Sequence, residues 1–558
     1  MTFDDQLAKW SRGWRGPALA ALVAFLAGLP GLLAVPPLDR DESRFAQATA
    51  QMLESQDFVV IRFQDQDRFK KPVGIHWMQA ASVTLLSSPE AREIWAYRIP
   101  SLLGAMLAAA ACAWGAAAFF GSSAGLLAGA MLGASFLLST EAMIAKTDAM
   151  LAGTTTLAIA ALARLYAAAR GGPPAGRGVE AIFWIALAVS ALVKGPIGPL
   201  VVGLTAAALT LMDRRPGWLL SLRWYWGLLV ALLVIGPWAG AVTVATDGGF
   251  WNAAIAGDLA PKLAGGQETH GAPPGYHTAL APLLAFPMTL LIPAALACAW
   301  LRRREPGVRF AVAWLVPTWV MFELLPTKLV HYPLPTYGAL AWLCAAALSQ
   351  PLGRLSRGIG AGLAIFAAAV LAGTCVYLLS TYGEGADVTW ASLAGGLLFA
   401  AGAVGAYMLM RQAPRAALVG AIGLGIAGHA AFVAGLAPRL DPLWLSDRTE
   451  QALGRAELLP SQGIADAPVA VAGFAEPSLV FALGTATELE GPVEAARAIA
   501  EQRPAVVEAR EEAAFQAALR TFGTQARAVG EVRGLDYSNG DDTLLRIYEQ
   551  APGARPTP

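Results

Sequence analysis

Long apolar windows are the feature of this sequence that most constrains its fold. Windows close to the ~20 residues that a helix needs to cross a bilayer recur along most of the chain. They occupy residues 17–36, 96–120, 123–140, 148–169, 179–193, 196–212, 225–245, 279–300, 308–324, 335–349, 358–380, 389–410 and 414–436. We therefore predict a polytopic α-helical membrane protein with about 13 transmembrane helices.

Composition agrees with a membrane protein and excludes several other classes. Hydrophobic residues make up 56% of the chain and charged residues only 14%, which is unlike a soluble protein. Acidic and basic residues balance at 40 each, so the chain lacks the positive charge typical of nucleic-acid binding. The four cysteines lie singly in apolar segments, without pairing or metal-ligand spacing, and we interpret them as packing residues.

The distribution of Lys and Arg predicts the orientation. The apolar run from Pro17 to Val35 has spanning length and no A-x-A cleavage signal, so we interpret it as a transmembrane helix and not a signal peptide. Basic residues cluster in alternate connections: Lys9/Arg12/Arg15, Arg170/Arg177, Arg214/Arg215/Arg223, Arg302/Arg303/Arg304, Arg354/Arg357 and Arg411/Arg415. The positive-inside rule places these in the cytoplasm, with the loop 37–95 and the C-terminal region in the periplasm of a bacterial inner membrane.

The region after Ala437 has the composition of a soluble domain. Its pattern predicts strands at "APVAVAGF", "PAVVEA" and around the turn Asn539-Gly540, with helices at 477–483, "PVEAARAIAEQ" and "EEAAFQAALRTF". We predict a transmembrane domain over residues 1–436 and a small periplasmic α/β domain over 437–558. No catalytic spacing is evident in the second.

Charged residues stand directly after the first apolar window, in "LDRDESRFAQATAQMLESQDFVV". Phe45, Ala48, Met52 and Leu53 recur at helical spacing, which predicts an amphipathic helix in the membrane interface with its polar residues on the other faces. A short hairpin should follow, before Lys71-Pro72 begins another apolar helix. A simpler interpretation is that Asp41 only caps the helix.

Other charged residues fall in the predicted periplasmic connections. Asp148 stands at the mouth between two windows, where an ionisable group is costly and often functional. Cations recur on the same side, together with one tyrosine: Lys71, Lys194, Lys262, Lys328 and Tyr332. A solvated Asp148 and snorkelling lysines are the plainer alternative. Together, however, carboxylates and cations suit an enzyme that binds a lipid phosphate and activates an acceptor.

The first loop resembles that of the ArnT-like branch of the protein-mannosyltransferase superfamily, which are polyprenyl-phosphate-sugar-dependent glycosyltransferases of the GT-C fold. The matching residues are Asp41-Glu42, Arg44-Phe45, Gln56-Asp57-Phe58 and Lys71-Pro72 with Trp77. Weaker matches are "AKTDAM", Lys194-Gly195-Pro196, the His270 region and "TKLVHYPLP".

The resemblance implies an inverting transfer of a sugar from an undecaprenyl-type phosphate to an acceptor such as lipid A at the periplasmic face. It implies Asp41 and Asp148 as catalytic carboxylates and Glu42 and Arg44 as residues that orient the loop. The cations Lys71, Lys194, Lys262 and Lys328, with Tyr332, would bind the donor phosphate. No nucleotide is expected, because the donor is already activated and no Walker-type loop is present.

One position departs from the family pattern. An acidic residue usually precedes the Lys-Pro pair and helps a later histidine to hold a metal, but this chain has Lys70 there, and only His270 remains as a candidate ligand. The sequence therefore establishes no cofactor, and it leaves open whether a divalent metal is bound although Lys70 replaces the usual acidic ligand. The extra ammonium suggests a more acidic donor or acceptor, a hypothesis that an unchanged donor preference in Lys70→Glu would contradict.

Other functions stay open from the sequence. A lipid-linked-sugar transporter or flippase should show interrupted windows at matching positions in two halves, and none is evident. An oligosaccharyltransferase should carry a W-W-D-type motif in its soluble domain, yet no tryptophan follows Trp444. Transfer to protein or to another envelope glycan is a further alternative, because fold analogy does not identify the acceptor.

Overall fold

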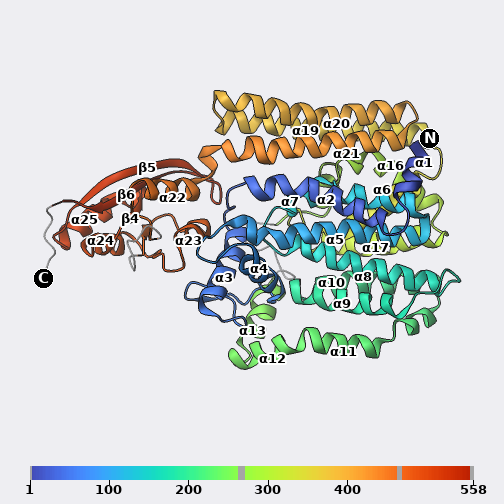
Figure 1. The fold of residues 1–558 in the computed structure, drawn as a ribbon, viewed down its shortest axis with the longest axis horizontal. Helices are drawn as coiled ribbons and strands as arrows, with labels where there is room; N and C mark the ends of the chain where they lie inside the picture. Colours follow the sequence, from blue (N-terminus) through green and yellow to red (C-terminus); the bar gives the residue numbers. More distant parts are fainter. Residues whose placement is uncertain (1–2, 262–270, 461–467, 553–558) are drawn as a thin grey trace.

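The membrane part is a bundle of helices that run along one common direction, and the C-terminal domain extends from one end of it (Figure 1). The computed structural model describes residues 3–261, 271–460 and 468–552. The N-terminus lies at the far end of the bundle (Figure 1). We refer to the end that carries the C-terminal domain as the domain end and to the other as the N-terminal end.

Helices occupy all of the predicted apolar windows. The α-helices up to residue 436 are α1(Phe3–Trp10), α2(Arg15–Ala34), α3(Asp41–Ser55), α4(Gly74–Leu86), α5(Ile94–Phe120), α6(Ser122–Gly133), α7(Phe136–Glu141), α8(Asp148–Ala168), α9(Arg177–Lys194), α10(Ile197–Asp213), α11(Trp224–Val234), α12(Gly236–Ala245), α13(Gly249–Asn252), α15(Tyr276–Leu284), α16(Ile292–Leu301), α17(Pro306–Leu324), α18(Tyr337–Ala347), α19(Arg354–Tyr382), α20(Val388–Met410) and α21(Pro414–Ala430). Short 3-10 or π segments are η1(Pro216–Leu222), η2(Ala253–Leu259), η3(Met288–Leu291), η4(Leu334–Thr336), η5(Gly385–Asp387), η6(Ala431–Leu436), η7(Ala437–Arg439) and η8(Asp441–Leu443).

The predicted number of about 13 spans is not confirmed. Among the described residues, seven helices are long and apolar enough to cross a bilayer, or nine if two bent pairs each count as one span. Several predicted windows are interrupted or short: α15 and the segment Met288–Leu301 bend by 113°, and α18 has only 11 residues. A hydropathy window gives the length of an apolar stretch but does not show whether the helix within it is broken. These breaks depend on how the helices turn inside the bundle.

Small residues let α5 and α8 approach closely. A Cβ added to Gly104 would lie 2.5 Å from the Met150 backbone, and one added to Gly153 would lie 2.4 Å from the Gly104 carbonyl oxygen. Glycines at such a crossing allow the backbones to touch, as in other membrane helix pairs. The contact fixes the start of α8, which carries Asp148, against α5.

The four cysteines behave as the sequence indicates. Cys112, Cys298, Cys344 and Cys375 are buried thiols without a disulfide. They are packing residues of the bundle.

The first loop has the predicted order of elements but a different environment. Helix α3 is followed by a hairpin of β1(Arg62–Phe63) and β2(Gln66–Asp67), and then by α4. The predicted apolar face of α3 is buried, yet the polar residues Glu42 and Gln47 are buried as well. The predicted amphipathic helix is present, but these two polar residues of its other faces are enclosed by protein. Gln47 is enclosed because it donates to Thr485 of the C-terminal domain and accepts from Arg92, each at 2.7 Å.

The C-terminal domain is a mixed four-stranded sheet covered on both faces. Its elements are α22(Leu445–Arg455), β3(Ala470–Ala472), α23(Pro477–Leu483), α24(Pro492–Ala500), β4(Ala505–Glu508), η10(Ala509–Glu511), α25(Glu512–Thr521), β5(Ala526–Asp536) and β6(Asp541–Gln550). The strand order is β3-β4-β6-β5, with β3 and β4 parallel and the other pairs antiparallel. Residues of α22 and α23 share one apolar cluster with the sheet, and those of α24 and α25 share another. The predicted helices and strands of this region are present, and α22 is an additional helix.

Candidate active site

A cavity of about 350 Å³ lies where the first loop meets the domain end of the bundle. It is lined by Asp39, Arg40, Asp41, Arg44, Phe45, Arg68, Lys70, Lys71, Lys146, Thr147, Asp148, Lys194, Asp258, Thr327, Leu329, His331 and Tyr332. Seven of these residues are Lys or Arg and four are Asp. The excess of cations makes the cavity suited to an anionic ligand.

Asp41 begins α3 and is exposed to the cavity. The N-cap of α3 is Arg40, without a side-chain cap, so Asp41 does not serve as the cap that the simpler interpretation assigned to it. Within the described part of the chain, the Asp41 carboxylate makes no hydrogen bond or ion pair. It is thus available to a ligand.

The backbone immediately before Asp41 is strained. Arg40 has φ 60° and ψ −103°, a conformation that residues with a Cβ seldom adopt. Its guanidinium donates from Nη2 to the carbonyl of Ser538 at 2.7 Å, and its own carbonyl accepts from the Arg44 amide at 2.9 Å. Contacts to both the helix and the C-terminal domain therefore maintain this conformation and set the position of Asp41.

The neighbouring carboxylate, Glu42, forms a buried ion pair that stabilises the fold. Glu42 and Arg98 form a fully buried bidentate pair, with Nε–Oε1 2.8 Å and Nη2–Oε2 2.7 Å. Glu42 also accepts from the amides of Leu38 and Ala145 at 2.9 and 2.7 Å. Arg98 in turn donates to the carbonyl of Val35 at 2.6 Å. The pair thus joins α2, α3, α5 and the connection before α8.

Asp148 lies at the base of the cavity among cations. Its Oδ1 is 2.5 Å from Lys194 Nζ and 3.6 Å from His331 Nε2, and its Oδ2 is 3.9 Å from Lys146 Nζ. This carboxylate is buried and its charge is compensated inside the protein, unlike that of Asp41. The two predicted catalytic acids therefore have different environments.

A buried glutamate, which the sequence reasoning missed, completes this network. Glu141 Oε2 is 3.0 Å from Lys146 Nζ, and Glu141 Oε1 is 3.7 Å from His331 Nδ1. Burial lowers the pKa of Lys146, but Glu141 and Asp148 more than offset this and raise it overall. Burial lowers the pKa of His331, so its imidazole is neutral near pH 7. An acidic residue at the end of an apolar window was the available signal for Glu141.

The first loop supplies cations to the cavity from the other side. Lys71 Nζ is 3.4 Å from Asp258 Oδ2, and Arg68 lies over the Phe45 ring at 5.1 Å. Asp258 belongs to η2 and was not predicted. Lys70 also lines the cavity, as does Arg44.

The remaining predicted residues are not all at the cavity. Tyr332 lines it, with Lys194 Nζ 5.8 Å from the centre of its ring. Lys328 is buried and donates to the Leu325 carbonyl at the end of α17 at 2.5 Å, and it is not among the lining residues. Lys262 and His270 lie outside the described residues.

The described residues do not fit the metal that the family resemblance implies. Lys70 offers an ammonium where that site needs a carboxylate, and a protonated amine is not a metal ligand. Glu141, Asp148 and His331 each have a ligand atom within 4.8 Å of the others. Two lysines, however, already neutralise that group, because Lys146 and Lys194 lie 3.0 and 2.5 Å from its carboxylates.

The C-terminal domain contacts the chain just before Asp41. The Asp39 amide donates to the Tyr537 hydroxyl at 2.7 Å, and the Ser478 hydroxyl donates to the Asp39 carboxylate. These partners come from α23 and from the turn between β5 and β6. Sequence reasoning assigned neither residue a place at the site.

Docking of this domain should depend on pH. Burial raises the pKa of Asp39 to about 7, and repulsion from Glu476 and Asp536 adds to the effect, while Tyr537 and Arg40 oppose it. Between the ordinary pKa of 3.8 and about 7 the docked state binds a proton that the undocked state lacks, so docking weakens as pH rises through this window. The protection of the Tyr537 and Ser538 amides, after correction for the intrinsic rise of the exchange rate with pH, should therefore be weaker at about pH 8 than at about pH 5.

In Asp39→Asn this loss of protection should be smaller, because the side chain no longer ionises. Burial also raises the pKa of Glu476, which leaves a smaller dependence of the same sign. An Asp39→Asn protein with the full pH dependence would contradict the assignment.

Comparisons with known proteins agree with this fold. A family model described as dolichyl-phosphate-mannose-protein mannosyltransferase matches residues 70–240, a range that includes Lys71, Asp148 and Lys194. Proteins named undecaprenyl phosphate-alpha-4-amino-4-deoxy-L-arabinose arabinosyl transferase are 31% identical over 367 residues in Pseudomonas paraeruginosa and 32% identical over 372 residues in Pseudomonas aeruginosa. Each alignment covers 63% of this chain and 64% of the relative, so the chain matches less than two thirds of their length.

A solved structure extends the likeness to nearly the whole chain. The crystal structure of ArnT from Cupriavidus metallidurans bound to undecaprenyl phosphate superposes with a TM-score of 0.75 and 20% sequence identity. It covers 95% of this chain and 96% of that one, which is a likeness of fold. The chain thus shares its overall fold with ArnT, and it is similar in sequence to the dolichyl-phosphate-mannose-protein mannosyltransferase family over residues 70–240 and to the named arabinosyl transferases over 63% of its length.

Proposed function

We propose that this protein is an inverting glycosyltransferase that moves a sugar from a polyprenyl (undecaprenyl) phosphate to an acceptor, lipid A or another envelope glycolipid. The observation that carries the proposal is the cavity at the domain end. There the Asp41 carboxylate, which makes no hydrogen bond or ion pair with the described residues, lies among seven Lys and Arg side chains. The names of the relatives supply the donor class, and both substrates are proposals for this chain.

The cations would serve the leaving group. When the bond between the anomeric carbon and the phosphate oxygen breaks, its electron pair stays on the phosphate, whose negative charge increases. Lys71, Lys70 and Arg68, which come from the first loop, can stabilise that charge. An electrophilic metal is not required for this step, since preorganised ammonium and guanidinium groups provide the same kind of stabilisation.

The two carboxylates would have unequal roles. Asp41, which has no hydrogen-bond or ion-pair partner among the described residues, can orient the acceptor and take its proton if the acceptor is a hydroxyl. An acceptor phosphate oxygen has no proton to lose. The acceptor oxygen attacks the anomeric carbon on the face opposite the departing phosphate, which inverts the configuration. Asp148, already compensated by Lys194, would hold that lysine and His331 in position.

The location of the cavity suits a reaction between two membrane-anchored substrates. It lies at the end of the helical bundle beside the first loop, where a lipid phosphate would meet the polar surface. Under the positive-inside assignment this end faces the periplasm, with the N-terminus in the cytoplasm of a bacterial inner membrane. Labelling of single cysteines introduced at the β5–β6 turn, in intact and permeabilised cells, tests this orientation.

Transfer itself is tested with purified protein in liposomes that contain an undecaprenyl-phosphate-linked aminoarabinose and lipid A. Mass spectrometry should detect lipid A that is heavier by one sugar, and the released undecaprenyl phosphate in equal amount. Lipid A from cells with and without the protein should differ in the same way. Donor turnover with unchanged lipid A would reject this acceptor alone. Movement of intact donor across the bilayer without any new glycosidic bond would instead support a flippase.

Replacing Lys71 by Gln should raise the KM for the donor by about tenfold or more, because a charge-assisted contact to the phosphate is lost. The measurement is a donor titration in liposomes. Arg62→Gln is the matched control, since Arg62 belongs to the same loop but pairs with Asp57 and Asp67 and does not line the cavity. Equal KM values for the two variants would remove Lys71 from the phosphate site.

A further inference from the structure

Glu141 is a buried acid behind the base of the candidate active site, and the proposed mechanism does not use it. It is the last residue of α7, is 3% exposed and does not line the cavity. Its Oε2 is 3.0 Å from the Nζ of Lys146, which does line the cavity. Among the described residues, Lys146 is the only Lys or Arg within ion-pair distance of Glu141. The pair therefore joins an enclosed carboxylate to a cation of the cavity.

Without Glu141, two ammonium groups would depend on one carboxylate. Lys194 Nζ is 2.5 Å from Asp148 Oδ1, whereas Lys146 Nζ is 3.9 Å from Asp148 Oδ2. His331 Nδ1 is 3.4 Å from Lys146 Nζ, but a neutral imidazole supplies no negative charge. A buried ammonium whose counter-charge is remote loses its proton or moves toward the remaining carboxylate. The Glu141 carboxylate opposes both changes.

The charged and titratable groups around Lys146 come from several elements. They are Glu141 from α7, Asp148 from α8, Lys194 from the end of α9, His331 from the segment before α18 and Asp41 from α3. Burial lowers the pKa of Lys146, but the charges of the three carboxylates raise it overall, that of Asp41 by the least. A ligand held by Asp41 would therefore lie within the field of the Lys146 ammonium.

We propose that Glu141 is a positioning residue that directs the Lys146 ammonium to the cavity, where this cation stabilises the negative charge on the departing phosphate. The inference rests on the proposed transfer reaction, in which the electron pair of the broken bond stays on that phosphate. Lys146 gives up no proton in this step and acts by its charge alone. Glu141 touches neither substrate, and its role toward Lys146 is the one proposed for Asp148 toward Lys194.

The pH profile of transfer by Glu141→Gln tests this role. The amide leaves Lys146 buried without its counter-charge, so burial lowers the pKa of the ammonium and the neutral amine forms as pH rises. Relative to the native protein in the same liposomes, the transfer rate of Glu141→Gln should fall by about tenfold between about pH 7 and about pH 9.5. Glu141→Asp, which keeps the charge, should have the native profile.

A second substitution at Lys146 separates positioning from a structural effect. A guanidinium stays protonated over this range, so Glu141→Gln/Lys146→Arg should lose the pH dependence. A double variant that retains it would overturn the inference. The same conclusion would follow from a loss of rate in Glu141→Gln that is equal at every pH, or from a Glu141→Asp protein with the profile of Glu141→Gln.

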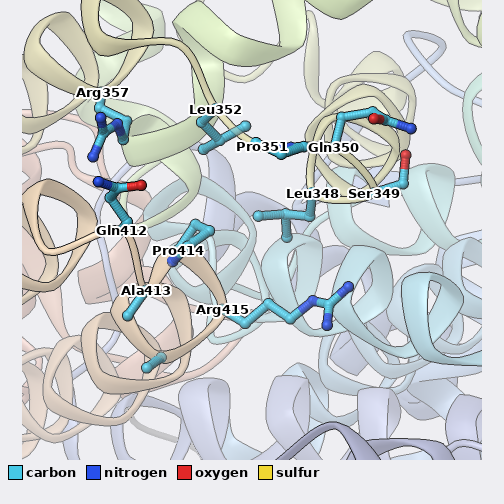
Figure 2. A pocket seen from close by; sticks show the side chains of 11 residues that line it. Leu348, Ser349, Gln350, Pro351, Leu352, Arg357, Gln412, Ala413, Pro414 and Arg415 are labelled. Carbon is cyan, nitrogen blue, oxygen red and sulfur yellow. The ribbon is translucent and has the colours of Figure 1, made fainter.

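Two buried charges outside the cavity lining provide controls. Glu323, in the last turn of α17, is 9% exposed and accepts from the amides of Gly275 and Thr278 at 2.8 Å. Arg357 is equally buried, in a cavity of about 630 Å³ between the end of α18 and the turn that joins α20 to α21 (Figure 2). Glu323→Gln and Arg357→Gln should keep the native pH profile. A profile like that of Glu141→Gln in either control would overturn the inference, because loss of any buried charge would then produce it.

Thermal unfolding distinguishes failure of this inference from failure of the proposed function. In folded Glu141→Gln the pKa of Lys146 should lie below the ordinary value of 10.5, so the unfolded state retains more protons as pH rises. Relative to the native protein, the unfolding temperature of this variant should therefore increase over the pH range in which its transfer rate falls. The measurement needs no substrate. Equal pH dependence of unfolding in the two proteins would overturn the inference, whereas absence of transfer by the native protein would reject the proposed function.

Discussion

Asp41→Asn is expected to lower the rate of sugar transfer by about 10²–10⁴-fold, the usual range for loss of a general base. The amide keeps the size of the side chain but cannot accept a proton or hold the acceptor by charge. Because Asp41 is exposed to the cavity and makes no ion pair with the described residues, folding should be unaffected. The rate in liposomes and the thermal unfolding temperature should therefore respond differently.

Two further substitutions make this result specific. Asp57→Asn is the control, because Asp57 lies in the same loop but accepts from the amides of Val59 and Val60 and does not line the cavity. It should retain most of the transfer rate. Asp148→Asn should lower both rate and stability, since it leaves Lys194 without its 2.5 Å partner. A fully active Asp41→Asn enzyme would refute the role of Asp41 while leaving the description of the fold unaffected.

Glu42→Gln is expected to destabilise the protein by about 3–5 kcal/mol, because it leaves the Arg98 guanidinium buried without its counter-charge. The pair is 0% and 1% exposed, so water cannot compensate for the loss. The loop that presents Asp41 is anchored through this pair, and transfer activity should fall with it. Thermal unfolding in detergent and the yield of folded protein in membranes measure the effect.

Glu54→Gln is the matched control for that prediction. It makes the same substitution in the same helix, but the Glu54 side chain is 35% exposed in its pair with Arg92. Solvent screens such a pair, and its loss should cost about 1 kcal/mol or less. Similar unfolding temperatures for the two variants would show that the Glu42–Arg98 pair does not anchor the loop.

Local patterns were sufficient to predict much of the fold. The apolar windows predict the helices of the bundle, and the sequence after Ala437 predicts the strands and helices of the sheet domain, apart from α22. The alternation of side chains along a strand and their spacing along a helix depend only on neighbouring residues. Whether a helix spans the bilayer or breaks, as between α15 and α16, depends on its neighbours in the bundle.

The candidate site also was only partly predictable from local sequence. The predicted residues Asp41, Lys71, Asp148 and Lys194 line one cavity, which the assignment of their loops to one membrane face made foreseeable. Lys328 was predicted on the same grounds, yet it is directed to the end of α17. A position in a loop indicates the face of the membrane but not the direction of the side chain.

The sequence by itself determined the class of protein, the helical membrane part followed by a small sheet domain, and the order of elements in the loop that carries Asp41, because hydropathy, periodicity and a short motif are local properties. Only the tertiary structure decided the contacts across long stretches of chain. Lys146 meets His331 across 185 residues, and Ser478 meets Asp39 across 439. Likewise Lys194 compensates Asp148 and the Ser538 carbonyl holds Arg40, since charges and hydrogen bonds act between groups that are near in space, wherever they lie in the chain.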